Sequence, residues 1–317
     1  MKILVTGGAG FIGAHVAGKL IARGDEVVII DNFNSYYEPQ LKRGRLDNLV
    51  GRQAKVYEID LADETGVSQV FTDHRFDQIC HLGAQAGVRY SLQHPQEYIK
   101  SNIVGTHNIL ENARQHNVTQ IVFASSSSVY GANTKIPFSE TDPVDRPISL
   151  YAATKKSNEL EFYAYHHLFG IDVIGLRFFT VYGPWGRPDM AYFSFARKIL
   201  KGEPIDVYNN GQMKRDFTYI DDIVAGVLAA LDNCHGYDIF NLGNNQPVAL
   251  EDFIDLLETN LGSKSQRNYL PLQDGDVVET YADITKAKTK LNWQPTTDIA
   301  EGISRFVEWY KNYYQIS

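Results

Sequence analysis

The sequence has little cysteine, no long apolar run and no excess of positive charge. Only two of its 317 residues are cysteines, Cys80 and Cys234, which excludes a disulfide framework and fits a reducing compartment. No stretch approaches the roughly 18 consecutive apolar residues of a membrane-spanning helix, and glycines interrupt the apolar start, which argues against a signal peptide. The net charge of −8 argues against nucleic acid or an anionic membrane as a partner. We therefore expect a cytoplasmic protein, for which a small anionic ligand stays possible.

Apolar strand-like segments alternate with helical periods through the first half of the chain. This alternation is typical of βαβ units, so it predicts an α/β fold with a doubly wound parallel sheet of the Rossmann type, covered by helices on both faces. Strands are expected at Lys2–Thr6, Glu26–Ile30, Val56–Asp60, Gln78–His81, Gln120–Ala124 and Asp172–Leu176. Helices are expected at Phe11–Arg23 and near Thr65–Asp73, Pro95–His116 and Leu150–Phe169.

The regular alternation ends after Arg177, where Pro184, Gly186 and Pro188 indicate a loop. Shorter, mixed elements follow, and a helix is expected near Ile299–Tyr313. We therefore predict that residues 1–176 form the main domain, to which later segments are free to return, and that residues 177–317 form mainly a smaller C-terminal lobe.

A glycine-rich turn follows the first predicted strand and opens the first predicted helix. Gly8, Gly10 and Gly13 fit the G-x-G-x-x-G spacing, and Gly7, Gly10 and Gly13 fit a related pattern. Small residues let the backbone approach a pyrophosphate, whose charge the helix N-terminus stabilises. Asp31, at the end of the second strand, can bond ribose hydroxyls and would repel a 2′-phosphate, which favours NAD over NADP. A turn that only packs helix on strand is the alternative.

Other residues at the strand ends complete the expected cofactor site. Asp60, at the end of the third strand, is placed to reach the adenine, although it could equally be a helix cap. The remaining expected contacts come from the glycine turn, from the strand ends and from the catalytic helix described next: Phe11, Ile12, Asn32, Leu61, Leu82, Ala84, Tyr151 and Lys155.

Tyr151 and Lys155 lie four residues apart at the start of a predicted helix, so phenol and ammonium share one helix face. The run Ser125–Ser128 ends a strand at the sheet edge where doubly wound folds bind ligands. Together with Val129-Tyr130-Gly131 and the glycine turn, this pattern resembles the extended short-chain dehydrogenase/reductase family over essentially the whole chain. The resemblance implies a catalytic set of Tyr151, Lys155 and Ser126.

The expected chemistry needs an acidic phenol. A tyrosine with a pKa of ~10 that serves as a base near pH 7 needs a shift of roughly three units, or about 4 kcal/mol. One cation about 4 Å away contributes on the order of 4 kcal/mol at an effective dielectric of about 20. We therefore expect Lys155, together with a positively charged nicotinamide ring, to supply this shift, while Ser126 positions the reacting hydroxyl.

The segment Arg177–Met190, together with Tyr36-Tyr37 and Ala86–Ser91, looks like the branch of the family that inverts C4 of UDP-glucuronate. Dehydratases and decarboxylases of the family carry carboxylates where this chain has Ser127 and Ser128, so neither reaction is expected. The resemblance implies reversible conversion of UDP-glucuronate to UDP-galacturonate through a 4-keto intermediate with bound NAD, which makes the enzyme an isomerase. It also implies a carboxylate clamp formed by Arg187, with Ser127, Ser128 and Thr180 as further donors. A solvated Arg187, or one paired with Asp189, is the alternative.

The UDP moiety is assigned by the same resemblance. Arg215 matches the diphosphate arginine of the family and Asp276 matches its uridine-ribose carboxylate. Gln273 stands where galactose-type enzymes have arginine, which leaves one phosphate contact in doubt. Arg89 could face the substrate, although a surface salt bridge is an equal possibility. The main domain is thus expected to bind NAD and the C-terminal lobe to bind the UDP-sugar.

Other readings stay possible from the sequence. The nearest alternatives are a 4-epimerase of neutral UDP-hexoses or N-acetylhexosamines and a UDP-glucuronate decarboxylase. A carbonyl reductase and a non-catalytic NAD sensor are more distant. No metal site is expected, because Cys80-His81 has no second pair at ligand spacing. Members of the family commonly dimerise through the helices that correspond to 95–116 and 150–169, so we expect a homodimer.

Overall fold

The computed structural model describes residues 1–272 and 277–316. Its main feature is a seven-stranded parallel sheet with the order β10-β6-β5-β4-β1-β2-β3. The strands are β1 (Lys2–Thr6), β2 (Glu26–Asp31), β3 (Lys55–Glu58), β4 (Gln78–His81), β5 (Gln120–Ser126), β6 (Asp172–Phe178) and β10 (Tyr237–Leu242). The predicted Rossmann-type α/β fold is confirmed, and β10 joins this sheet from the later part of the chain.

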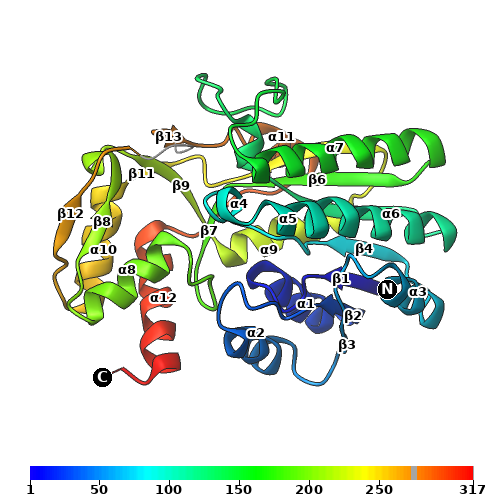
Figure 1. Ribbon diagram of the computed structural model, residues 1–317, viewed down its shortest axis with the longest axis horizontal. Helices are drawn as coiled ribbons and strands as arrows, with labels where there is room; N and C mark the ends of the chain where they lie inside the picture. Colours follow the sequence, from blue (N-terminus) through cyan, green and yellow to red (C-terminus); the bar gives the residue numbers. More distant parts are fainter. Residues whose placement is uncertain (273–276, 317) are drawn as a thin grey trace.

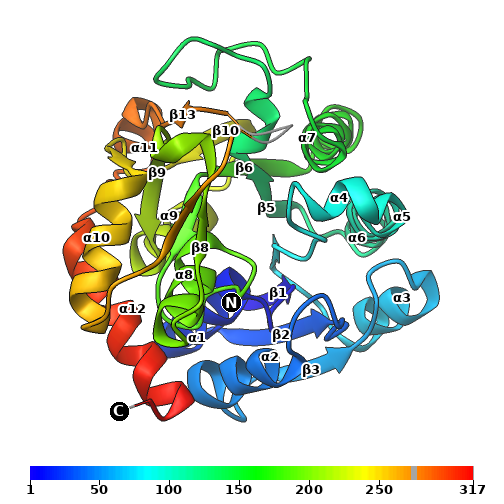
Figure 2. The same ribbon diagram turned by 60° about the vertical axis from the view of Figure 1, so that its left-hand side comes forward.

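Helices cover both faces of this sheet, as Figures 1 and 2 show. The helices of the described chain are α1 (Phe11–Arg23), α2 (Pro39–Arg45), α3 (Glu64–Asp73), α4 (Tyr90–Gln93), α5 (Pro95–Tyr98), α6 (Gly105–Gln115), α7 (Leu150–Phe169), α8 (Ala191–Leu200), α9 (Ile220–Asp232), α10 (Leu250–Leu261), α11 (Thr285–Lys290) and α12 (Ile299–Tyr314). A helical turn at Leu46–Val50 extends α2, and another at Ile99–Val104 joins α5 to α6.

Alternate side chains of the strands pack into separate layers, because successive residues of a strand point to opposite faces. In β1, Ile3 and Val5 belong to the layer that includes residues of α1 and α9, whereas Leu4 packs with residues of α3, α6 and α7. This burial on both faces explains why the strands are almost uniformly apolar.

A smaller group of elements lies beside the carboxyl edge of the main sheet, at the left of Figure 1. Its strands are β7 (Thr180–Tyr182), β8 (Ile205–Val207), β9 (Lys214–Tyr219), β11 (Pro247–Ala249), β12 (Arg267–Tyr269) and β13 (Glu279–Thr280). Strands β7, β11 and β13 all pair with β9, and β8 pairs with β12. Helices α8, α10 and α12 pack beside these strands, and one apolar core runs from α1 to α12.

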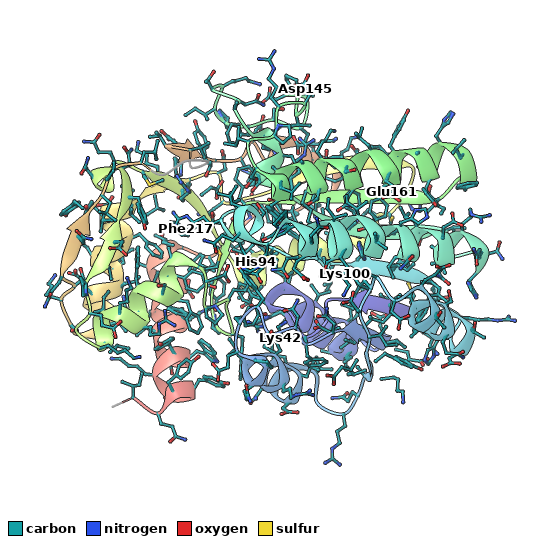
Figure 3. The ribbon with its side chains drawn as sticks, viewed as in Figure 1. Lys42, His94, Lys100, Asp145, Glu161 and Phe217 are labelled. Carbon is teal, nitrogen blue, oxygen red and sulfur yellow. The ribbon has the colours of Figure 1, made fainter. Side chains whose placement is uncertain are left out.

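Helix α7 begins and ends at clear local signals. The Ser149 hydroxyl accepts a hydrogen bond from the Ala152 N–H, which caps the N-terminus, and Gly170 ends the helix with a φ of 68°. The segment between η3 (Ser127–Tyr130) and α7 projects beyond the body of the protein, where Figure 3 labels Asp145. No helix within the described ranges is long and apolar enough to cross a membrane.

Candidate active site

A cavity of about 460 Å³ lies at the carboxyl ends of the parallel strands, where ligands of doubly wound folds bind. Its size is typical of a site for a small molecule or cofactor. All the residues predicted to contact the cofactor line it: Gly7, Gly10, Phe11, Ile12, Gly13, Asp31, Asn32, Asp60, Leu61, Leu82, Ala84, Tyr151 and Lys155. The sequence therefore identified one contiguous wall of the cavity.

The glycine turn is too tightly folded for larger residues. The Gly7 N–H donates to the Ile30 carbonyl at 2.8 Å, and the Gly10 N–H donates to the Gly7 carbonyl at 2.9 Å. A Cβ added to Gly13 would lie 2.1 Å from the Gly7 oxygen, which is far inside van der Waals contact. The turn brings the N-terminus of α1 to the cavity, an arrangement that suits a bound pyrophosphate.

Two carboxylates stand at the strand ends beside this turn. Asp31 accepts hydrogen bonds from the Ala9 N–H at 3.0 Å and from the Phe33 N–H at 2.9 Å, which ties the second strand to the glycine turn. Asp60 accepts hydrogen bonds from Lys100 at 2.8 Å and from Asn32 at 3.3 Å, and these bonds hold the Asp60 pKa below its ordinary value against the effect of burial. Both side chains are thus held in place at the cavity wall by hydrogen bonds.

The predicted catalytic residues converge on the same cavity from two elements. Tyr151 and Lys155 come from the first turns of α7, and Ser126 is the last residue of β5. The Lys155 ammonium donates to the Ala124 carbonyl at 2.9 Å, and Ser126 lies near enough to the Tyr151 phenol to lower its pKa. The structure therefore brings together all three side chains that the sequence predicted.

The electrostatics of Tyr151 differ from the expectation. Burial raises the pKa of the phenol, while the hydrogen bond with Ser126 and the positive charge of Arg187 lower it by a smaller amount. Burial also lowers the pKa of Lys155 to about 8, and its ammonium is bonded to Ala124 and not to the phenol. The protein alone thus keeps Tyr151 protonated at neutral pH, because Ser126 and Arg187 only partly offset desolvation.

The residues predicted to bind the sugar line the same cavity: Ser127, Ser128, Thr180 and Arg187. Arg187 makes a two-point ion pair with Asp189, in which its Nε lies 3.0 Å from the carboxylate, so the pairing left open by the sequence is present. Arg187 uses its Nε–Nη2 edge for this contact. Burial by itself would lower the Arg187 pKa, but the Asp189 carboxylate and the nearby tyrosines outweigh this effect and raise it.

The three residues assigned to the UDP moiety have different outcomes. Arg215 lines the cavity, and its Nη1 also donates to the Val278 carbonyl at 3.1 Å. Arg89 is not among the lining residues, and its guanidinium lies 4.8 Å above the ring of Tyr208. Asp276 and the neighbouring Gln273 lie outside the described residues. Arg215 is thus the one of the three that the structure places at the cavity.

The chain matches the model of the NAD dependent epimerase/dehydratase family over residues 3–243. The chain belongs to this family. UDP-glucuronate 4-epimerase 1 of Arabidopsis thaliana is 49% identical over 332 residues, which span 99% of this chain and 77% of that protein. Membership confirms the resemblance to extended short-chain dehydrogenases/reductases, and it agrees with the paired Tyr151 and Lys155 in the cavity.

Solved structures of the family share the fold closely. UDP-glucuronic acid 4-epimerase of Bacillus cereus, in complex with UDP-glucuronic acid and NAD, superposes with a TM-score of 0.93 at 36% identity, covering 99% of this chain and 100% of that one. UDP-glucose 4-epimerase of Thermotoga maritima, with UDP-glucose, gives a TM-score of 0.91 at 34% identity, with the same coverage. Because both scores are nearly equal, substrate choice within the family has to be argued from side chains.

Two residues near the strand ends, Lys42 and His81, were not part of the predicted site. Lys42 lines the cavity, and its ammonium donates to the backbone and side-chain oxygens of Asn34; the sequence analysis missed it, and Figure 3 places it near the middle of the molecule. The signal that could have identified Lys42 is a basic residue on α2, the first helix after the strand that ends at Asp31. His81 is buried between Thr6 and Thr106, and burial lowers its pKa to about 3, so it is a neutral core residue.

Proposed function

We propose that the chain catalyses the reversible C4 epimerisation of UDP-glucuronate to UDP-galacturonate with bound NAD. The observation that carries this proposal is one cavity lined by the glycine turn, by Tyr151 and Ser126, and by Arg187 on the opposite wall. A nucleotide cofactor, an acid/base pair and a carboxylate-binding fork are the groups that this reaction needs. The relatives that carry this name in plants and in Bacillus cereus support the same assignment.

The glycine turn and Asp31 fit NAD. The turn leaves no room for a Cβ at Gly13, and Asp31 has further lone pairs beside the backbone bonds that it accepts. Bound NAD would supply the hydride acceptor and donor that inversion at C4 requires. Its positive ring would add to the effects that lower the Tyr151 pKa.

Tyr151 is proposed to take the proton from the O4 hydroxyl of the sugar and to return it. Ser126, which lines the cavity with the phenol, is proposed to bind the reacting oxygen together with Tyr151 and to fix its position. Lys155 is anchored by Ala124, so its charge stands at a constant place beside α7. Because these contacts exist before substrate arrives, the groups are preorganised for proton transfer.

Arg187 is proposed to bind the carboxylate of the uronate. Asp189 takes the Nε–Nη2 edge of its guanidinium, so the Nη1 side of the planar fork is the side proposed to face a second carboxylate. Ser127, Ser128 and Thr180 line the same wall as neutral donors. Holding the carboxylate away from alignment with a 4-keto group would protect the intermediate from loss of carbon dioxide.

A 4-epimerase of neutral UDP-hexoses is the second candidate. The observation in its favour is the ion pair between Arg187 and Asp189, which already neutralises the charge that a uronate would meet. The two candidates are separated by incubating purified protein with UDP-glucuronate and, separately, with UDP-glucose, and by resolving the C4 epimers by NMR. Formation of UDP-galacturonate supports the proposal, and turnover of UDP-glucose alone contradicts it. Release of carbon dioxide would identify a decarboxylase.

A homodimer is proposed to form through α6 and α7, which Figure 2 shows beside each other at the outer edge of the molecule. Four large apolar side chains of α7 are exposed, Leu160 at 60%, Tyr163 at 53%, Leu168 at 67% and Phe169 at 46%. Val104, which directly precedes α6, is 42% exposed. Exposed apolar clusters of this kind mark association surfaces. Leu160→Glu should yield monomers in light scattering, whereas Ile136→Glu, on the projecting loop, should not.

The two buried free cysteines fit a proposed cytoplasmic location.

A further inference from the structure

Arg45, the last residue of α2, is a fully buried cation that the mechanism above does not use. Its Nε donates to the Trp185 carbonyl at 2.7 Å and its Nη2 to the Gly186 carbonyl at 2.9 Å. Its Nη1 donates to the Ala9 carbonyl at 3.1 Å and to the Tyr37 hydroxyl at 2.6 Å. Each of these acceptors within the described chain is neutral. A buried charge with only neutral partners is costly, so its position calls for a reason beyond packing.

The backbone acceptors belong to two segments, each of which contributes other residues to the cavity. Ala9 lies in the glycine turn, whereas Trp185 and Gly186 directly precede Arg187. One planar guanidinium therefore bridges the cofactor wall and the segment that carries the proposed carboxylate clamp. A planar fork holds two consecutive carbonyls at a fixed spacing, whereas an ammonium on a flexible stem does not impose that spacing.

The bridged segment is held in a conformation that needs support. Trp185 has a φ of 62°, in the left-handed region that a bulky residue rarely adopts. Its indole packs against Trp309 and Tyr313 of α12, with ring centroids 5.2 and 4.9 Å away. Arg45 holds its carbonyl from the other side. Trp185, which lies two residues before Arg187, is thus held both through its indole ring and through its carbonyl oxygen.

We propose that Arg45 is a positioning residue, which holds residues 185–187 against the glycine turn so that Arg187 faces the sugar. This inference rests on the proposed function, because it gives the Arg187 clamp its support. Arg45 does not line the cavity, so it acts through the backbone that it binds and through Arg187. Asp189 binds the Nε–Nη2 edge of the Arg187 guanidinium.

The test compares Arg45→Lys with Arg43→Lys. Arg43 lies on the same helix, but its side chain is 57% exposed and pairs with Glu58. Arg45→Lys keeps the charge and loses the fork, so amide hydrogen exchange across residues 183–190 should become faster. The KM for UDP-glucuronate should rise about tenfold or more with kcat nearly unchanged, because a clamp contact acts in both ground and transition states. Arg43→Lys should change neither.

A double mutant separates positioning from a general structural role. In an Arg187→Ala background, Arg45→Lys should cause little further loss of kcat/KM for UDP-glucuronate, because the two residues act through one contact. A full additional loss, or equal losses with UDP-glucuronate and UDP-glucose, would overturn the proposal. Arg45→Gln, tested in the same assays, serves if the lysine variant does not fold.

The exchange measurement distinguishes failure of this inference from failure of the proposed function. If the unaltered protein does not epimerise UDP-glucuronate, the function is wrong, yet faster exchange across 183–190 in Arg45→Lys alone still supports the tether. If the unaltered protein does epimerise UDP-glucuronate and Arg45→Lys leaves both exchange and KM unchanged, the function stands and the positioning role is wrong.

Discussion

The two walls of the active site are built in different ways. The cofactor wall comes from the carboxyl ends of strands in one parallel sheet: Asp31 ends β2 and Ser126 ends β5. The opposite wall comes from separate segments: Thr180 begins β7, Arg187 lies in the loop before α8, and Arg215 lies on β9. Sheet register places the first wall, whereas contacts between distant segments place the second. Substitutions on the first wall should therefore change turnover and cofactor affinity. Substitutions on the second wall should change which sugar the protein accepts.

Tyr151→Phe should have the largest effect, because it removes the proton acceptor and leaves the ring in place. We expect turnover of UDP-glucuronate to fall at least about 1,000-fold, within the range of acid–base contributions. The affinity for NAD should change less than threefold, about 0.6 kcal/mol or less. Initial rates by NMR and NAD titration by calorimetry check both.

Tyr163→Phe is the matched control, because Tyr163 lies on the same helix and is 53% exposed. It should behave as the unaltered protein. If Tyr151→Phe retained turnover, this phenol would have no role in the mechanism. The proposed division between a wall that carries out the chemistry and a wall that binds the substrate would then also be wrong.

Arg187→Ala should have the next largest effect, confined to the acidic substrate. We expect kcat/KM for UDP-glucuronate to fall about 100-fold, equivalent to about 2.7 kcal/mol for a charge-assisted contact, while any activity toward UDP-glucose stays within a fewfold. Released carbon dioxide should also be measured, because a loosened carboxylate favours decarboxylation. Arg197→Ala, an exposed arginine of α8, is the control. Equal losses with both sugars would show that Arg187 does not discriminate.

The same contrast explains what the sequence could predict. The first strand and α7 were placed at the residues where the structure has them, because apolar periodicity and caps are local signals. The paired strands around β9 were expected only as mixed elements, because their register depends on partners far along the chain. Arg45 was missed for the same reason: its acceptor Trp185 lies 140 residues away.

Lys155→Met should reveal the buried charge on the cofactor wall through its pH dependence. Burial lowers the Lys155 pKa from 10.5 to about 8 in the folded protein. Between these values the unfolded chain binds more protons, so this group makes the unfolding free energy rise with pH. The stability of the variant relative to the unaltered protein should therefore fall by about 1.8 kcal/mol, roughly 20-fold in the folding constant, between pH 7.5 and 9.5.

Urea unfolding of both proteins at pH 7.5 and 9.5, without added nucleotide, measures this change. Lys288→Met, at an exposed position of α11, should show no comparable pH dependence. A constant stability difference between Lys155→Met and the unaltered protein would mean that Lys155 keeps an ordinary pKa in the folded state.

Asp31→Asn should have the smallest effect and tests the cofactor wall directly. The carboxylate accepts the Ala9 and Phe33 N–H groups, and an amide presents one acceptor oxygen in place of two. We expect NAD affinity to fall about tenfold and the preference for NAD over NADP to shrink, because the charge that repels a 2′-phosphate is gone. Asp63→Asn, which alters a carboxylate that also accepts a backbone N–H but caps α3, is the control for lost helix stability. If both nucleotides bind Asp31→Asn as they bind the unaltered protein, cofactor choice is not set at the end of β2, and the cofactor wall is less local than its sequence pattern indicates.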